Sequence, residues 1–190
     1  DSEVIPTFGA KEAIFSFAQT VVNPNDKKDL VLVTEPGYPV ASRGARFAGA
    51  EVIQLPLKRD NYFLPDLDSV RNDVWNRTAV LWLNYPNNPT GACAPLSLYE
   101  KASRLAEKHN FLIASDEAYT ELYFAEPPCS ALQVKDRKRL VIFNSLSKRS
   151  SMTSYRIGFI VCSPEIAEVL KTYRPTVGTA PQEFVQYAAV

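Results

Sequence analysis

A lysine among small hydroxyl residues is the first candidate for chemistry in this sequence. The apolar run at residues 140–143 leads into Ser145 and then into Lys148, and Arg156 comes eight residues after the lysine. A lysine amine aimed into a cleft can form a Schiff base with a carbonyl compound. An arginine can bind an anion through two parallel hydrogen bonds. The alternative is a solvated lysine in a basic loop, and this stretch alone favours neither interpretation.

Other polar and aromatic residues follow other apolar runs. The runs at residues 4–8, 30–33, 78–83 and 111–115 predict strands. The residues that come after them are Ala10 and Lys11 at a predicted helix start, Tyr38, Asn88, Asp116 and Tyr119. Ligands of open α/β sheets bind outside the carboxyl ends of the strands. Each residue could instead be explained as packing, a turn or a cap, but their convergence on one edge favours a binding site.

A helix start behind Gly9 could bind phosphate, because the first backbone N–H groups of a helix have no partner within it. A simple tight turn also explains one glycine. The sequence contains neither G-x-x-x-x-G-K-[ST] nor G-x-G-x-x-G. Their absence counts against a plain nucleotide-binding α/β protein.

Strand and helix patterns alternate along the chain. Apolar spacing and capping signals predict helices at residues 10–22 and 40–48, from Asp66, from a capping box at Ser97 to about residue 108, and from Pro164. Further strands are predicted at residues 51–55, on the edge of the sheet, and at residues 156–162. We therefore expect an α/β fold of three α/β/α layers with a mostly parallel, seven-stranded sheet. The one histidine, His109, is expected to be solvated at a helix end.

Composition sets the limits of these interpretations. The 190 residues carry no net charge and are 46% hydrophobic, which is typical of one soluble domain without a nucleic-acid partner. No apolar run approaches the ~20 residues of a membrane span, and no signal peptide is visible. Three separated cysteines and one histidine predict neither a metal site nor a disulfide framework, and they fit a reducing cytoplasm. Because Met152 is the only methionine, we expect the sequence to be part of a longer protein.

The motifs, taken in order, resemble those of the fold-type I, pyridoxal-phosphate-dependent aminotransferases of class I and II. The matching stretches are TFGAKE at residues 7–12, PGYP at 36–39, NYPNNPTG at 84–91, DEAY at 116–119, SLSK at 145–148 and RIG at 156–158. Each stretch alone is weak, but the ordered set is specific and spans nearly the whole chain. The resemblance implies that residues 1–190 are the cofactor-binding major domain. The N-terminal arm and the C-terminal small domain of the family would be absent.

The resemblance also implies roles for the candidate residues. Lys148 would hold pyridoxal 5'-phosphate as a Schiff base and then move the substrate proton. Asp116 would pair with the pyridine nitrogen, and Tyr38 would stack on the ring. Asn88 and Tyr119 would hydrogen-bond the ring oxygen. The phosphate would be bound by a group of four residues, with Ser147 a weaker candidate for the same task. These four are Ala10, Lys11, Ser145 and Arg156.

The resemblance implies a cytoplasmic homodimer that acts on an amino acid and a 2-oxo acid. The branch it resembles contains the N-succinyldiaminopimelate aminotransferases of bacterial lysine synthesis. Because the small domain would supply substrate contacts, we expect this chain alone to turn over poorly. A pyridoxal-phosphate lyase of the same fold, or a folded domain that no longer catalyses, are the alternatives. One departure is Ser154, where the family usually has glycine. If that position requires a positive φ or a close backbone approach, serine would be strained there and would disturb Arg156.

Overall fold

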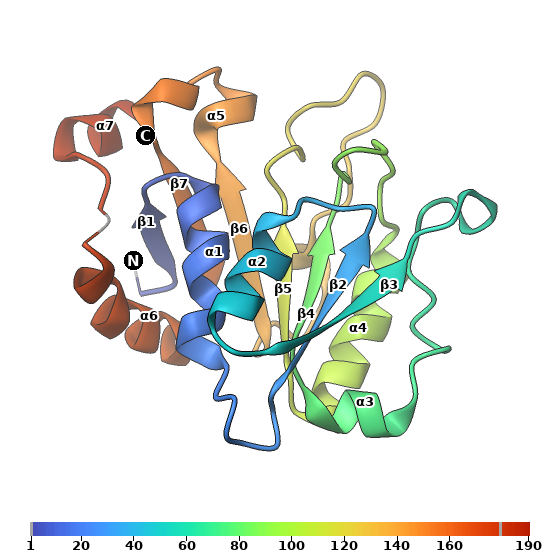
Figure 1. The fold of residues 1–190 in the computed structure, drawn as a ribbon. Helices are drawn as coiled ribbons and strands as arrows, with labels where there is room; N and C mark the ends of the chain where they lie inside the picture. The colour runs from blue at the N-terminus through green and yellow to red at the C-terminus, as the bar shows by residue number, and fades with distance from the viewer. Residues whose placement is uncertain (1, 179) are drawn as a thin grey trace.

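A seven-stranded sheet forms the centre of the molecule, with the strand order β1-β7-β6-β5-β4-β2-β3. The computed structural model describes residues 2–178 and 180–190 (Figure 1). The strands are β1 (Val4–Thr7), β2 (Leu30–Glu35), β3 (Glu51–Pro56), β4 (Thr78–Asn84), β5 (Leu112–Asp116), β6 (Leu140–Ser145) and β7 (Gly158–Cys162). Strands β2 to β6 run parallel to one another, whereas β7 is antiparallel to both β6 and β1. The predicted mostly parallel sheet and the edge position of residues 51–55 are confirmed.

Helices cover both faces of the sheet, as the continuous apolar strands require. The helices are α1 (Ala10–Val21), α2 (Val40–Phe47), α3 (Asn72–Arg77), α4 (Leu96–His109), α5 (Leu146–Arg149), α6 (Pro164–Val177) and α7 (Glu183–Ala188). One core cluster packs α1, α2 and α6 against one face, and a second packs α3 and α4 against the other. The predicted three-layer α/β/α architecture is therefore confirmed. Among the described residues, no helix has the length and apolarity that crossing a membrane requires.

Strand direction decides which segments meet at the carboxyl edge, which we define as the edge where β2, β4, β5 and β6 end. Because β7 is antiparallel to β6, its first residue, Gly158, lies opposite Ser145, the last residue of β6. Thr7, the last residue of β1, lies opposite Gly158 as well. The start of α1 and the segment that precedes β7 are thereby brought to the same edge as the ends of the parallel strands.

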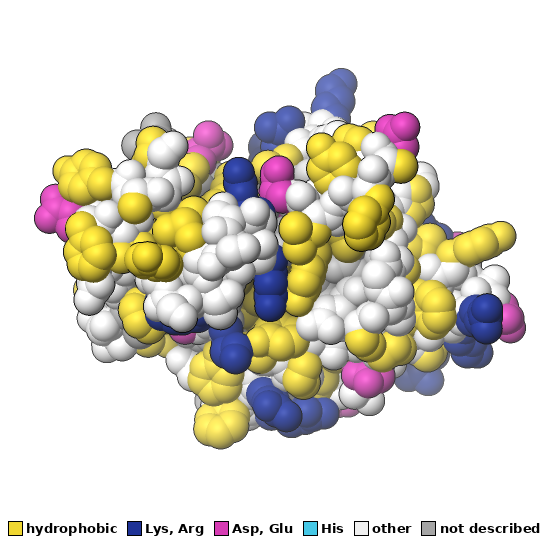
Figure 2. All heavy atoms as spheres, turned by 90° about the horizontal axis from the view of Figure 1, so that it is seen from above, with side chains coloured by type: hydrophobic (Ala, Val, Ile, Leu, Met, Phe, Trp, Pro, Cys, Tyr) yellow, Lys and Arg dark blue, Asp and Glu magenta, His cyan; other side chains and the backbone are white. Residues whose placement is uncertain are grey.

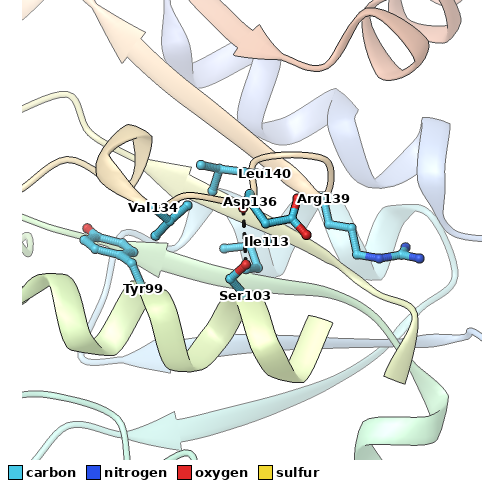
Figure 3. Close-up of a pocket in the computed structure, with 7 residues that line it drawn as sticks. All are labelled: Tyr99, Ser103, Ile113, Val134, Asp136, Arg139 and Leu140. Carbon is cyan, nitrogen blue, oxygen red and sulfur yellow. Dashed lines mark hydrogen bonds between the residues drawn. The ribbon is translucent and has the colours of Figure 1, made fainter. Parts of the chain in front are cut away.

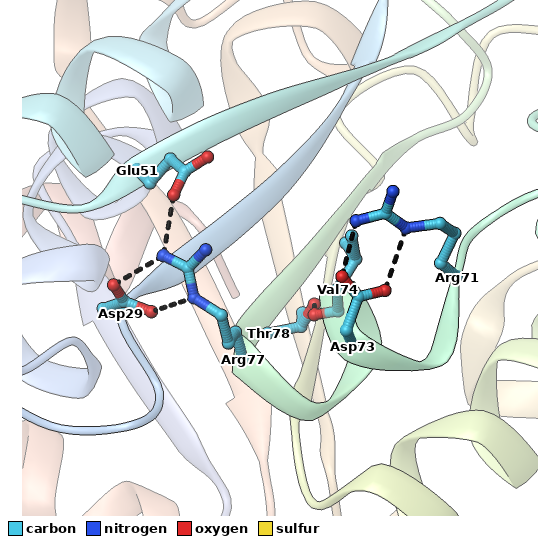
Figure 4. Close-up of polar contacts among 7 residues, drawn as sticks. All are labelled: Asp29, Glu51, Arg71, Asp73, Val74, Arg77 and Thr78. Carbon is cyan, nitrogen blue, oxygen red and sulfur yellow. Dashed lines mark hydrogen bonds and ion pairs between the residues drawn. The ribbon is translucent and has the colours of Figure 1, made fainter.

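The opposite, amino edge is held by charge pairs between neighbouring elements (Figure 4). Arg77, at the end of α3, donates from Nε and Nη2 to the Asp29 carboxylate at 3.0 and 2.7 Å. Its Nη2 also donates to Glu51 Oε2 on β3 at 2.7 Å. These hydrogen bonds lower the pKa of Asp29 and raise that of Arg77. The three side chains join the beginnings of β2, β3 and β4.

Three local expectations were wrong. No helix begins at Asp66, because its carboxylate accepts from the Asp68 N–H at 3.1 Å and favours a turn instead. Ser97 does not cap α4, since the Pro95 carbonyl already accepts from the Leu98 N–H at 3.1 Å and the helix begins at Leu96. The last strand begins at Gly158 and not at residue 156.

His109 is buried, contrary to the expectation that it is solvated. Its ring stacks on Trp75 of α3 at 6.2 Å between centroids, and its Nδ1 lies 2.8 Å from Asn76 Oδ1. Burial is the main reason that its pKa is lowered, and Lys108 and Lys28 contribute further. The sequence places His109 at a helix end, but it does not reveal that α3 covers this end. His109 lies at the amino edge, away from the candidate site.

Candidate functional site

A cavity of about 420 Å³ lies at the carboxyl edge of the sheet. Figure 2 looks down on this edge and shows Lys and Arg side chains along the middle of the face. All nine predicted site residues line the cavity, and they are Ala10, Lys11, Tyr38, Asn88, Asp116, Tyr119, Ser145, Lys148 and Arg156. Ile14, Ala118, Ser147 and Thr153 complete its lining. The fold therefore brings together side chains that are up to 146 positions apart, between Ala10 and Arg156.

Asp116 is a buried carboxyl group at the end of β5, with 6% of its surface exposed. One of its oxygens accepts a hydrogen bond from the Ala118 N–H at 3.3 Å. None of the ion pairs found among the described residues involves Asp116. Its pKa is raised from 3.8 to about 7, mainly by burial and to a smaller extent by the neighbouring Glu117, while the hydrogen bond from Ala118 acts in the opposite direction. A carboxyl group in this setting strongly favours a cationic or N–H partner from a ligand.

Asn84 connects two of the predicted site residues, and the sequence analysis missed it. Its side-chain N–H donates to the Asp116 carbonyl at 3.2 Å, and its side-chain oxygen accepts from the Asn88 N–H at 3.0 Å. Asn84 is buried and is the last residue of β4. Its place in the loop motif at residues 84–91 was the available signal. From the sequence, only Asn88 of this motif is predicted to contribute chemistry.

Arg156 lies against the beginning of α1. Its Nη1 donates to the Thr153 carbonyl at 2.9 Å, and its Nη2 donates to the Phe8 carbonyl at 3.4 Å. A Cβ atom on Gly9 would lie 2.3 Å from Nη2, and Gly9 has a φ of 78°. Only glycine therefore permits both the backbone turn and the close approach of the guanidinium group.

The first turn of α1 leaves backbone donors available to the cavity. Gly9 precedes the helix and has no side chain to cap it, while Ala10 and Lys11 line the cavity. Gly158 permits this helix start to come close, because a Cβ atom there would lie 2.9 Å from the Ala10 nitrogen. The positive end of a 12-residue helix, beside an arginine, is a suitable environment for an anionic group.

Lys148 lies in the short helix α5 at the rim of the cavity and is exposed. Its Nζ lies 5.7 Å from the centroid of the Tyr119 ring. The hydroxyl oxygen of Ser145 caps α5 by accepting from the Ser147 N–H at 3.1 Å. The end of β6 and the cap of α5 together set the direction in which the lysine leaves the backbone.

Ser154 does not have the backbone conformation that would strain it. It lies exposed in the 3-10 turn Thr153–Tyr155 and has no positive φ. The left-handed residues of this segment are Ser151, with φ 53°, and Arg156 itself, with φ 55°. The concern about Ser154 therefore does not apply, and the unusual backbone conformation is found at the arginine.

A second hollow, shown in Figure 3, is too small to be a ligand site. It lies between α4 and the beginnings of β5 and β6, and its volume of about 10 Å³ is close to the least that can hold one water molecule. The Ser103 hydroxyl donates across it to the Asp136 carbonyl at 3.2 Å. The chemistry-bearing residues named above therefore mark the larger cavity as the candidate site.

Comparison with known proteins gives the family. A family model of class I and II aminotransferases matches residues 1–190. The chain belongs to this family. It is 43% identical to the LL-diaminopimelate aminotransferase of Aquifex aeolicus over 192 aligned residues, which cover 100% of this chain and 49% of that enzyme. The chain thus spans about half the length of the curated relatives it matches.

Solved aminotransferase structures share the fold. An aspartate aminotransferase from Thermotoga maritima superposes with a TM-score of 0.91 at 31% identity, covering 99% of this chain and 50% of the other. A Thermus thermophilus protein described as a probable N-succinyldiaminopimelate aminotransferase gives a TM-score of 0.85 at 32% identity, covering 92% and 46%. Aminotransferases of this family use pyridoxal 5'-phosphate, and the predicted family and fold class are confirmed.

Proposed function

We propose that this chain is the cofactor-binding major domain of an aminotransferase that uses pyridoxal 5'-phosphate. One observation carries the proposal. A single cavity collects an exposed lysine amine, a buried carboxyl group without an ion-pair partner among the described residues, and a helix start beside an arginine. Each of these features alone is weak evidence for a function. Together they suit one small molecule with a group that reacts with the lysine amine, a basic nitrogen for the carboxyl group and an anion for the helix start and the arginine.

The donor set fits this cofactor. Arg156 and the N–H groups of Ala10 and Lys11 would bind the phosphate, and the missing side chain of Gly9 leaves the guanidinium room beside the helix start. Ser145 would contribute its hydroxyl group, although the structure uses it as a helix cap. The Asp116 carboxyl group would hold the proton of the pyridine nitrogen. Tyr38 would pack on the ring, and Asn88 and Tyr119 would hydrogen-bond its oxygen.

The reaction needs a proton to be taken from the α-carbon of the amino acid. When bound, the cofactor supplies an electron sink that stabilises negative charge at this carbon. Lys148 Nζ takes the proton and returns it, as a positioned general base. The position of Nζ near the Tyr119 ring, in the lining of the cavity, supports this role. Asp116 would hold a proton elsewhere in the lining of the cavity, where its burial limits contact with water.

The substrate class follows from the relatives. Curated relatives are named LL-diaminopimelate aminotransferases, and a structural neighbour is described by its N-succinyldiaminopimelate activity. We infer that the whole protein transfers an amino group between diaminopimelate, or its N-succinyl derivative, and a 2-oxo acid such as the one derived from glutamate. The reaction would then belong to lysine biosynthesis.

We also infer that the whole protein is a cytoplasmic homodimer. An apolar loop beside the site supports the dimer, since Leu122, Tyr123 and Phe124 are 49%, 50% and 111% exposed. Contiguous exposed apolar groups are typical of interaction surfaces. All three cysteines are free, which supports a reducing compartment. Light scattering of the purified full-length protein tests the dimer directly.

Borohydride trapping tests the proposed function. The full-length protein is incubated with pyridoxal 5'-phosphate, reduced with borohydride and digested, and the modified peptide is identified by mass spectrometry. We expect the modification on Lys148, its loss in Lys148→Ala, and its retention in Lys135→Ala, which removes an exposed lysine away from the cavity. Amino transfer from diaminopimelate to 2-oxoglutarate is then measured. Modification elsewhere, or release of a thiol or ammonia without amino transfer, would contradict the proposal.

A further inference from the structure

Glu117 is a buried carboxylate beside the site to which the proposed reaction gives no role. Only 2% of its surface is exposed. It follows Asp116 directly, and neighbouring residues at the end of a strand point to opposite faces. Asp116 lies with Ile14 of α1 around a cavity on one face. Glu117 instead contacts the backbone of Ala131, which belongs to the core cluster on the other face.

Three donors hold the Glu117 carboxylate. Oε1 accepts from the Ser115 hydroxyl at 3.0 Å and from the Ala131 N–H at 2.9 Å. Oε2 accepts from the Ser130 hydroxyl at 2.7 Å. The carboxylate thereby joins the end of β5 to the 3-10 turn Ala131–Gln133, which lies 14 residues further along the chain.

The backbone of Glu117 is fixed as well. Its N–H donates to the Phe143 carbonyl of β6 at 2.8 Å. Its carbonyl accepts from the Thr120 hydroxyl at 2.9 Å and from the Thr120 N–H at 3.2 Å. Glu117, which follows Asp116 and comes two residues before Tyr119, is therefore held by β6, by its own turn and by the connector after it.

Hydrogen bonds hold the carboxylate in place, and none of the ion pairs found in the described part of the chain includes Glu117. The titratable side chains that face it are Asp116 from its own strand end, Tyr99 from α4 and Cys129 from the connector. Burial raises the pKa of Tyr99 and of Cys129, so both are neutral at pH 7. The loss of the carboxylate would leave the Ala131 N–H and two hydroxyl groups without their acceptor.

We propose that Glu117 is a positioning residue, which ties the turn after β5 to the connector at Ser130–Ala131 and so directs Asp116 and Tyr119 into the cavity. The inference rests on the proposed function for the roles of those two side chains. Without the tie, the turn keeps its hydrogen bonds to β6, Thr120 and Asn84 but loses its link to the connector. The two side chains can then rotate away from the positions that suit a bound cofactor.

The test compares cofactor binding and cofactor orientation in folded variants of the full-length protein. Glu117→Ala removes the acceptor. Glu117→Gln keeps the shape, because its oxygen can accept from Ala131 and its amide can donate to the Ser130 oxygen. Glu121→Gln is the matched control, since Glu121 is an exposed glutamate in the same turn region. The readouts are the dissociation constant of pyridoxal 5'-phosphate and the visible circular dichroism per bound cofactor, measured well below the melting temperature.

We expect Glu117→Ala to raise the dissociation constant about tenfold and to reduce the dichroism, because charged hydrogen bonds of this kind are lost. Glu117→Gln should stay within about threefold of the parent protein, and Glu121→Gln should match it. A folded Glu117→Ala variant with the parent's affinity and dichroism would overturn the inference. If Glu117→Ala does not fold, Ser130→Ala removes one of the three donors and should shift both readouts in the same direction. Unchanged values in Ser130→Ala would also overturn it.

A separate measurement distinguishes this inference from the proposed function. If the parent protein binds no pyridoxal 5'-phosphate, the proposed function fails. Amide hydrogen exchange of residues 115–120 in the cofactor-free protein then decides the positioning role. Faster exchange in Glu117→Ala than in Glu121→Gln supports the tie, whereas equal exchange in the two variants overturns it.

Discussion

The two edges of the sheet use the same residue types in opposite ways. At the amino edge, Arg77 binds Asp29 and Glu51, and His109 contacts Asn76. At the carboxyl edge, Asp116 has no ion pair among those found in the described chain, and Lys148 is exposed at the rim of a cavity. Groups that satisfy one another contribute to stability, and charged groups without an ion-pair partner in a cavity are available to a ligand. The same substitution at both edges should therefore have opposite consequences.

The largest contrast is expected between two lysines. Lys148→Met should lower the rate of amino transfer by about a thousandfold or more, because the general base is lost. Lys28 at the amino edge donates to the His109 carbonyl, so Lys28→Met should keep the rate and lower the free energy of unfolding by about 1 kcal/mol. Turnover assays and urea unfolding of both variants measure the two effects. If Lys148→Met kept a tenth of the parent rate of amino transfer or more, the proposed role of Lys148 as general base would be contradicted.

Two aspartates provide the second contrast. Asp116→Asn should lower the rate about a hundredfold and stabilise the cofactor-free protein at pH 8, because a buried carboxylate no longer has to be desolvated. Asp29→Asn should leave the rate unchanged and cost less than about 1 kcal/mol, since the pair with Arg77 is partly exposed. Thermal melting and rates at pH 8 check both. Equal loss of stability in the two variants would contradict the assignment of the edges.

Two asparagines give a smaller contrast. Asn84→Ala should raise the dissociation constant of pyridoxal 5'-phosphate about tenfold, because the bridge between Asp116 and Asn88 is lost. Asn76→Ala leaves the bridge intact and should instead lower the free energy of unfolding by about 1 kcal/mol. Absorbance titration and urea unfolding separate the two results. A normal cofactor affinity in Asn84→Ala would show that the backbone alone positions the site.

The smallest contrast is in how the melting temperature depends on pH, where we expect Asp116 and Asp29 to cause changes of a few degrees in opposite directions. Asp116 has a folded pKa of about 7 against an ordinary value of 3.8. Between these values the unfolded chain releases a proton that the folded chain keeps, so the cofactor-free protein loses stability as pH rises. The pKa of Asp29 is lowered, so its contribution is lost as pH falls into the acidic range. Burial raises the pKa of Glu117 as well, so melting temperatures from pH 3 to 8 should fall less steeply with rising pH in Asp116→Asn than in the parent protein, without becoming flat.

Sequence alone predicted the sheet, because each buried strand is a continuous apolar run such as residues 30–33 and 140–143. It also predicted which residues meet in the cavity, since the carboxyl ends of parallel strands lie at one edge. The resemblance to the family added their roles. Helix beginnings were predicted less well. The Asp66 side chain forms a turn where a helix was expected, and the Pro95 carbonyl accepts the first hydrogen bond of α4 in place of the expected Ser97 cap.

Long-range partners were beyond the sequence analysis. Nothing near His109 in the chain reveals that Trp75 covers it. Asn84 and Glu117 lie inside the recognised motifs, yet their hydrogen bonds depend on loops that meet only in the folded protein. The condition under which Ser154 would be strained by a positive φ is not met, because the left-handed conformation falls on Ser151 and Arg156. Motifs therefore identified the residues that line the cavity, and the structure was needed to find those that hold them.

The pairing of β1 with β7 sets the order in which a ribosome can complete this protein. Val4 lies opposite Val161, so the first strand leaves the exit tunnel about 150 residues before its partner. At about 5–20 residues per second, β1 waits roughly 8–30 seconds for β7. The beginning of α1 cannot join the cavity until β7 is made. A ligand present during synthesis thus meets the complete cavity only after β7, which ends at Cys162, has emerged.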